Sequence, residues 1–145
     1  MYGRAFYSDV ADALTGFLPP SLRDFEYYRT NSNLKVWYTG DGREHYEVQI
    51  LKHNKKIVLE IGFHAEHKDR DRNEEAMQSL TRVEKKWRGK LGAEPEVGPF
   101  IGQQSGTWRR VSETWDATDD PEMAVDAAAR LADYITTLEP IRKPT

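Results

Sequence analysis

Hydrophobic and polar residues alternate along residues 43–67, and this alternation predicts a β-hairpin with one apolar face and one ionisable face. Successive side chains of a strand point to opposite faces, so every second residue lies on the same side. The apolar positions are Tyr46, Val48 and Ile50 in the first strand and Ile57, Leu59, Ile61 and Phe63 in the second. The other elements of the chain are arranged around this hairpin.

A turn at His53–Asn54 would join the two strands, because Asn tolerates a positive φ. This turn sets a register in which each apolar residue faces an apolar partner and a one-residue slip breaks every pair. The predicted pairs are Ile50 with Ile57, Val48 with Leu59, and Tyr46 with Ile61. We therefore expect Val48, Ile50, Leu59 and Ile61 to be buried.

The same register predicts an unusual group of ionisable side chains on the other face. Glu47 would lie directly opposite Glu60, where two like charges destabilise a sheet unless something compensates. His45 would lie opposite Gly62 and diagonal to both Glu60 and His64. Four ionisable groups would then surround a position that has no side chain.

Further helices and strands are predicted on both sides of the hairpin. Apolar residues at spacings of three and four predict a helix from Ser8 to Leu18, a helix from about Asn73 to Leu91, and a helix from Asp120–Pro121 to Pro140. A short helix could begin at Ser21. Alternation predicts strands over 34–39 and 107–115 and a short strand over 97–101, and a turn is expected over 103–106.

The element order α-β-β-β-α-β-β-α predicts one α+β domain over residues 1–145, a two-layer sandwich of about five antiparallel strands with helices on one face. The other sheet face would be open to water, a ligand or a second subunit. With Val111 and Trp115 facing the core, Trp108 and Arg110 join Trp37 on that open face. The order of elements resembles that of class I type III secretion chaperones and similar small α+β domains, in element order alone.

Composition narrows the function classes only modestly. The chain has 145 residues and a net charge of −3, so no overall field draws it to nucleic acid or to a membrane. It has no Cys, which excludes thiolate metal sites, and its first ten residues lack the apolar stretch of a signal peptide. We expect a cytoplasmic protein that uses no cofactor and binds neither nucleic acid nor membrane.

A metal site is the main chemical alternative. His64 and His67 are three residues apart, whereas the helical zinc motif needs a spacing of four. Glu60 and His64 on one straight strand would be roughly 13 Å apart, four rises of about 3.3 Å, which is too far to share an ion. A metal would instead need His45, Glu47 and Glu60.

Two hypotheses remain from the sequence. The first is a non-enzymatic protein whose open sheet face binds a protein partner or a second copy of itself, forming a homodimer. The second is a small metal-dependent or acid–base enzyme that uses the ionisable patch. The candidate patch consists of His45, Glu47, Glu60, His64, Trp37, Trp108 and Arg110. We expect Arg110 to bridge Glu47 and Glu60, because surface acids are commonly neutralised by Arg or Lys.

Overall fold

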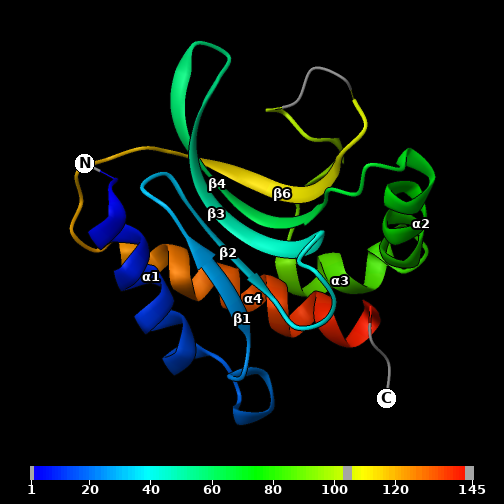
Figure 1. Cartoon of the computed structure of the whole chain (residues 1–145), viewed down its shortest axis with the longest axis horizontal. Helices are drawn as coiled ribbons and strands as arrows, with labels where there is room; N and C mark the ends of the chain where they lie inside the picture. The colour runs from blue at the N-terminus through cyan, green and yellow to red at the C-terminus, as the bar shows by residue number, and fades with distance from the viewer. Residues whose placement is uncertain (1, 103–105, 143–145) are drawn as a thin grey trace.

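The computed structural model of the protein describes residues 2–102 and 106–142 and has the predicted two-layer α+β architecture (Figure 1). Six strands form one antiparallel sheet in the order β1-β2-β3-β4-β6-β5. The strands are β1 (Glu26–Arg29), β2 (Asn33–Trp37), β3 (Glu44–His53), β4 (Lys56–Ala65), β5 (Glu96–Pro99) and β6 (Arg109–Asp116). The helices are α1 (Arg4–Phe17), α2 (Arg70–Thr81), α3 (Glu84–Leu91) and α4 (Met123–Arg142), with a short 3-10 helix η1 (Pro20–Leu22). The predicted fold class is therefore confirmed, with a sixth strand added.

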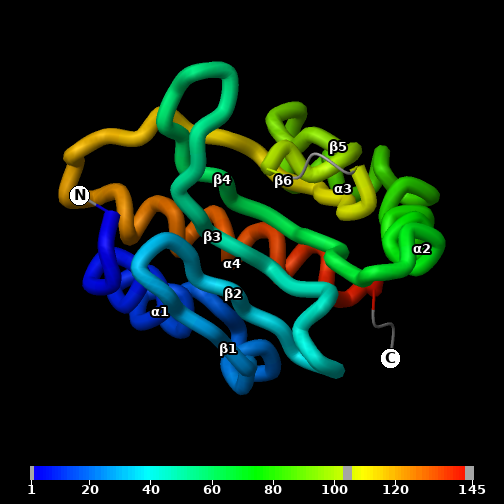
Figure 2. The backbone as a smooth tube through the Cα atoms, turned by 45° about the horizontal axis from the view of Figure 1, so that its top comes forward, coloured from blue at the N-terminus to red at the C-terminus, as the bar shows by residue number. Residues whose placement is uncertain are grey.

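The helices cover one face of this sheet. Figures 1 and 2 show α4 running across the back of the strands, while the turn between β3 and β4 projects beyond the sheet. Val48, Leu59 and Ile61 are fully buried in the core beneath the helices, as predicted, whereas Ile50 is only partly buried. No helix within residues 2–102 and 106–142 is long and apolar enough to cross a membrane.

The predicted hairpin forms, but its register differs from the predicted one by two residues. Asn54 and Lys55 occupy the turn with φ of 52° and 66°, so His53 pairs with Lys56. Two left-handed residues suit a two-residue hairpin turn because their twist matches that of the strands. A shift of two keeps every side chain on its predicted face and still pairs apolar residues with one another. The apolar pairs become Ile50 with Leu59, Val48 with Ile61, and Tyr46 with Phe63.

Several element boundaries also differ from the predictions. Residues 26–29 form β1 rather than part of a second helix. Helix α1 begins at Arg4, so Ser8 lies inside it, where its hydroxyl donates to the Arg4 carbonyl instead of capping the helix. The predicted helix over 73–91 is divided at Val83, whose φ of −124° is not helical. Asp69 caps α2, and α4 continues through Pro140. Most of the turn predicted over 103–106 lies outside the described residues.

Candidate metal centre

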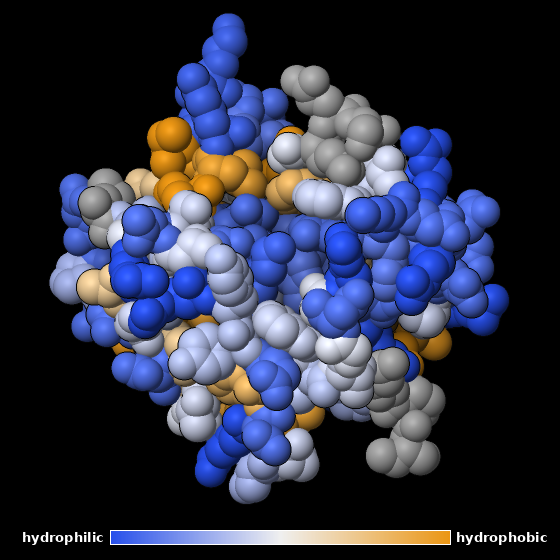
Figure 3. Space-filling model, in the orientation of Figure 1, coloured by the Kyte–Doolittle hydropathy of each residue, from blue (hydrophilic) through white to orange (hydrophobic). Residues whose placement is uncertain are grey.

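The ionisable face of the sheet is a packed cluster rather than an open surface. His45, Glu47, Glu60 and His64 are each at most 2% exposed, so the expectation of an open face is wrong at its centre. Figure 3 shows hydrophilic side chains gathered over the middle of this face. The Phe100 ring packs against the ring of His64, with 4.9 Å between their centroids, and covers part of the cluster.

The corrected register changes the neighbours of every residue in the cluster. Glu47 lies opposite Gly62, not opposite Glu60, and His45 lies opposite His64, not opposite Gly62. The two imidazole rings are 5.5 Å apart between centroids. The Glu47 side chain thus extends over the space at Gly62, where no side chain competes with it.

Gly62 also brings together two residues that the sequence appeared to keep apart. A Cβ atom added at Gly62 would lie 2.6 Å from Ser112 Cβ and closer still to the Val111 carbonyl oxygen, so only glycine fits between β4 and β6. Glu60 and His64 flank this empty position on the same face, and their side chains close the gap. His64 Nε2 lies 3.1 Å from Glu60 Oε2, so the expected separation of these groups was wrong because it counted only the backbone rise.

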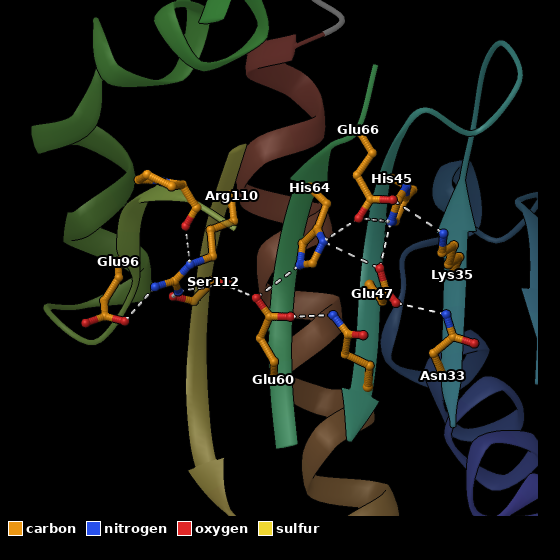
Figure 4. A network of polar contacts seen from close by, with 12 residues as sticks. Asn33, Lys35, His45, Glu47, Glu60, His64, Glu66, Glu96, Arg110 and Ser112 are labelled. Atoms are coloured by element: carbon orange, nitrogen blue, oxygen red, sulfur yellow. Dashed lines mark hydrogen bonds and ion pairs between the residues drawn. The ribbon is translucent and has the colours of Figure 1, made fainter. Parts of the chain in front are cut away.

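Four ligand-type atoms converge beside this gap (Figure 4). They come from His45, Glu47, His64 and Glu66, and all lie within 4.8 Å of one another. His45 Nε2 is 2.8 Å from Glu47 Oε1, and His64 Nδ1 is 2.9 Å from Glu66 Oε2. The cross distances are 3.5 Å from His64 Nδ1 to Glu47 Oε1 and 3.7 Å from His45 Nε2 to Glu66 Oε2. Bonds of about 2.0–2.2 Å to one metal ion place tetrahedral ligand atoms roughly 3.3–3.6 Å apart, which small shifts here would supply.

Both imidazoles are oriented by a bond from the nitrogen that points away from the convergence point. His45 Nδ1 donates to the Gly42 carbonyl at 2.8 Å, since that carbonyl can only accept, and this leaves Nε2 facing the carboxylates. His64 Nε2 donates to Glu60, which leaves Nδ1 facing inward. A carbonyl or carboxylate on the second nitrogen is the usual way in which proteins orient metal-binding histidines.

The two converging carboxylates are held in the same manner. The second oxygen of Glu47 accepts from the Asn33 amide at 2.9 Å, and the second oxygen of Glu66 lies 3.4 Å from the Lys35 ammonium. Asn33 and Lys35 come from β2, next to β3 in the sheet. Each of the four candidate ligands therefore has its remaining polar atom fixed by a neighbour, and one atom left for the centre.

Glu60 serves as the support of the site instead of as one of its converging ligands. Its oxygens accept from Gln49 at 2.7 Å, from Ser112 at 2.6 Å and from His64. Burial alone would raise the pKa of Glu60, but the charge of His64 and these hydrogen bonds lower it below its usual value. A deprotonated Glu60 is the form that best accepts the His64 proton.

The electrostatics of the cluster follow from its buried carboxylates. Burial opposes a charge on His64, yet the Glu60 charge and the surrounding hydrogen bonds raise the His64 pKa well above 6.5. Burial likewise opposes a charge on Glu66, but the hydrogen bond from His64 and the nearby histidine and lysine charges lower its pKa to about 2. Glu47, Glu60 and Glu66 with Lys35 carry a formal charge of −2 when both imidazoles are neutral, so the cluster favours added positive charge.

The remaining residues of the predicted patch lie at its margins. Arg110 does not bridge Glu47 and Glu60, contrary to our expectation. Its guanidinium pairs with Glu96 at 3.0 Å and reaches Glu60 only through the Ser112 hydroxyl (Figure 4). Trp37 lines a pocket beside Glu66, and the Trp108 ring is tilted against the ring of Phe100, with 6.1 Å between their centroids.

The residues that sequence reasoning missed are Glu66 and the outer partners Asn33, Lys35, Gly42 and Ser112. A signal for Glu66 was present, because residues 60, 62, 64 and 66 share one face if the alternation of β4 continues past Ala65. The hydrogen bond from the Glu66 amide to the Arg43 carbonyl, at 2.7 Å, shows that it does. His67, by contrast, lies outside the cluster and pairs with Glu44 at 2.7 Å.

Comparison of the chain with known protein families, with curated protein sequences and with solved structures finds no match. The likeness in element order to type III secretion chaperones therefore brings no function to this chain. The functional argument depends on the side chains themselves.

Proposed function

We propose that this protein binds one divalent transition-metal ion through His45, Glu47, His64 and Glu66. The observation that carries the proposal is the convergence of two imidazole nitrogens and two carboxylate oxygens within 4.8 Å in a buried cluster. The proposed ligand set keeps His45 and Glu47 from the set considered in the sequence and adds His64 and Glu66. Glu60 is no longer a ligand but the hydrogen-bond partner of His64.

The donor set narrows the class of metal. Imidazole with carboxylate suits Zn²⁺, Mn²⁺, Fe²⁺ and Co²⁺, whereas the absence of Cys removes the thiolates that favour Cu⁺ and iron–sulfur clusters. A divalent cation also balances the formal charge of −2 that the three carboxylates and Lys35 leave. The outer hydrogen bonds support the proposal because they hold the ligand atoms in place before an ion arrives.

Metal uptake by the purified protein tests this proposal. We expect Zn²⁺ or Co²⁺ to bind the wild type with a stoichiometry near one in isothermal titration calorimetry, and metal analysis after dialysis to give the same ratio. His64→Gln and Glu66→Gln should each weaken binding at least 100-fold, since each removes a ligand.

His67→Gln and Glu44→Gln are the matched controls. They remove a second, partly buried His–Glu pair that lies outside the cluster, and both should bind metal as the wild type does. If none of the four metals binds, or if His64→Gln binds as tightly as the wild type, the cluster is a hydrogen-bonded network maintained by protons and the proposal is wrong.

A second candidate function is self-association through the edge of the sheet. Tyr27 and Tyr28 on edge strand β1 are 58% and 55% exposed, and β1 pairs with β2 on one side only among the described strands. An edge strand with apolar side chains favours pairing with another strand. We propose a homodimer in which β1 of one copy meets β1 of the other, in keeping with the partner expected from the sequence.

Sedimentation velocity at high micromolar concentration distinguishes the monomer from the homodimer. The wild type should sediment with twice the mass of the chain, and the double variant Tyr27→Lys with Tyr28→Lys should sediment as a monomer. A wild type that is monomeric at these concentrations would count against the dimer and leave the metal proposal untouched.

A further inference from the structure

A pocket of about 300 Å³ adjoins the proposed metal centre on the side of Glu66. Its walls come from β1, β2, the turn that precedes β3 and the residue that follows β4, and they include Tyr28, Lys35, Trp37, Arg43 and Glu66. Glu66 belongs to both places, because one of its oxygens faces the convergence point and the other lies next to Lys35. Figure 4 shows Lys35 and Glu66 side by side at this end of the cluster.

The turn before β3 positions the pocket and the metal centre together. The Gly42 carbonyl accepts the hydrogen bond that orients His45. On its other side, a Cβ added at Gly42 would lie 3.1 Å from the Trp37 ring, so the glycine backbone packs against the indole. Gly42 has a φ of +84°, a conformation that favours glycine. One residue therefore supports a proposed ligand and the aromatic wall of the pocket.

The lining combines charged hydrogen-bond donors with aromatic rings. Lys35 and Arg43 bring two cations to the opening, and Tyr28 and Trp37 bring two ring systems. Asp41 is the one other acid in the lining and is already engaged with Arg43, at 3.8 Å from its Nε and through the Arg43 amide. Such a lining suits a small molecule that has an anionic oxygen group and a flat apolar part.

We propose that this pocket binds a small aromatic carboxylate whose oxygen coordinates the metal ion beside Glu66. This inference rests on the proposed metal site and adds the class of ligand. Lys35 and Arg43 can each donate hydrogen bonds to the carboxylate as it enters, and Trp37 and Tyr28 receive the ring. An ion held by four side chains can take a further oxygen ligand by expanding its coordination, as zinc does in catalytic sites.

Cobalt-loaded protein provides the test, because the visible absorption of Co²⁺ changes when an oxygen ligand is added. Benzoate is the probe, benzamide tests the need for the negative charge, and acetate tests the need for the ring. We expect benzoate to change the Co²⁺ spectrum and to bind at least tenfold more tightly than either comparison molecule. Binding of benzoate to the metal-free protein should be at least tenfold weaker.

Arg43→Met is the informative variant, because its side chain lines the pocket and has no contact with a candidate ligand. It should bind Co²⁺ with the affinity of the wild type and bind benzoate about tenfold more weakly. Lys52→Met, which removes an exposed cation near the hairpin tip, is the control and should leave benzoate binding unchanged.

The two proposals fail in different ways. A protein that takes up no Co²⁺ overturns the metal site and this inference with it. A protein that takes up Co²⁺ through His64 and Glu66, but binds benzoate no better than benzamide or equally well without metal, overturns the pocket assignment alone.

Discussion

The two faces of β3 and β4 are both buried, but they are stabilised by different physics. On the helix side, Val48, Leu59 and Ile61 lose all contact with water, and their contribution scales with apolar area and has little directional requirement. On the other side, His45 and Glu60 are just as buried, but each needs particular partners at hydrogen-bond distance. A two-residue shift of register leaves the apolar face apolar and changes every pair on the polar face. The polar face is therefore the part of the molecule that depends on exact strand alignment.

The buried polar atoms of this face have the hydrogen-bond partners that they need. Among residues 2–102 and 106–142, the one buried side-chain nitrogen or oxygen without a hydrogen-bond partner is Arg29 Nε, on β1. Every polar atom at the centre of the His–Glu cluster has a partner. Removing one partner leaves a buried group unsatisfied, which costs about 1–3 kcal/mol and more for a charge. Damage to this face should thus appear in metal binding and pH dependence as well as in stability.

Leu59→Ala should produce the largest loss, and the loss should belong to the apolar face alone. Leu59 is fully buried in the core, so we expect the free energy of unfolding to fall by about 2–5 kcal/mol. Urea denaturation measures this loss, and calorimetry on the folded fraction should show unchanged zinc affinity. A loss below about 1 kcal/mol would mean that Leu59 does not lie in a closely packed core.

The stability of the metal-free protein should depend on pH through the titratable groups of the polar face. The pKa of Glu66 is lowered from 4.5 to about 2, so its stabilisation is present above about pH 4.5 and is lost as the pH falls toward 2, by up to about 3 kcal/mol. The pKa of His64 is raised above 6.5, so its contribution is complete below about pH 6.5 and is lost as the pH rises through the higher folded-state value. Stability should therefore be greatest between about pH 4.5 and 6.5.

Urea denaturation in the presence of a chelator, from pH 3 to pH 10, checks both limbs of this profile. His64→Gln should remove the alkaline decline, and Glu66→Gln should reduce the acid decline. His67→Gln is the control for a buried histidine outside the cluster. An alkaline limb that persists in His64→Gln would assign it to another group.

Gly62→Ala should break the alignment between β4 and β6. Its new methyl group would collide with the backbone at Val111 and Ser112, and overpacking of this kind costs about 1–3 kcal/mol. Gly98→Ala is a matched control, because Gly98 has nearly the same φ, 159° against 155°, and nothing within 4 Å of an added Cβ. Thermal unfolding should separate the two variants, and equal losses would trace the cost to backbone conformation instead of the close approach.

Lys55→Gly should give the smallest effect and a favourable one. Lys55 is in the left-handed region with a φ of 66°, and Asn-Gly is the preferred sequence for such a turn. Relief of this strain, less the entropy cost of glycine, should stabilise the hairpin by about 0.5–1 kcal/mol. Chemical denaturation measures the gain, and metal affinity should not change, because the turn touches neither face. A loss of stability would argue against Asn54–Lys55 as the turn.

The sequence predicts well those elements in which apolar and polar residues alternate regularly. Alternation identified β3 and β4, the faces of their side chains and the burial of Val48, Leu59 and Ile61. It missed β1, because adjacent aromatic residues at Tyr27 and Tyr28 do not alternate with polar ones. It also missed the break at Val83, because the apolar stripe continues through it and the interruption shows only in the backbone angles.

The candidate site was predicted in composition but not in geometry. His45, Glu47, Glu60 and His64 do lie together in the structure, yet their contacts depend on a register that apolar pairing does not determine. The predicted turn, His53–Asn54, and the observed turn, Asn54–Lys55, both lack glycine, and both place apolar residues opposite one another. Glu60 and His64 meet across Gly62 because their side chains extend toward each other. The rise per residue along a strand gives only the separation of their backbones.

All four proposed ligands come from one hairpin, between residues 45 and 66. Hairpins of this kind form in about 1–10 μs, well before distant segments of a mixed α/β domain meet. The helix α4, which covers the opposite face, begins at Met123 and must close a much longer loop. The proposed metal centre is therefore local in sequence within a domain whose core is not. An ion captured by the hairpin would fix the strand register first, and the helices would then dock on a sheet that is already aligned.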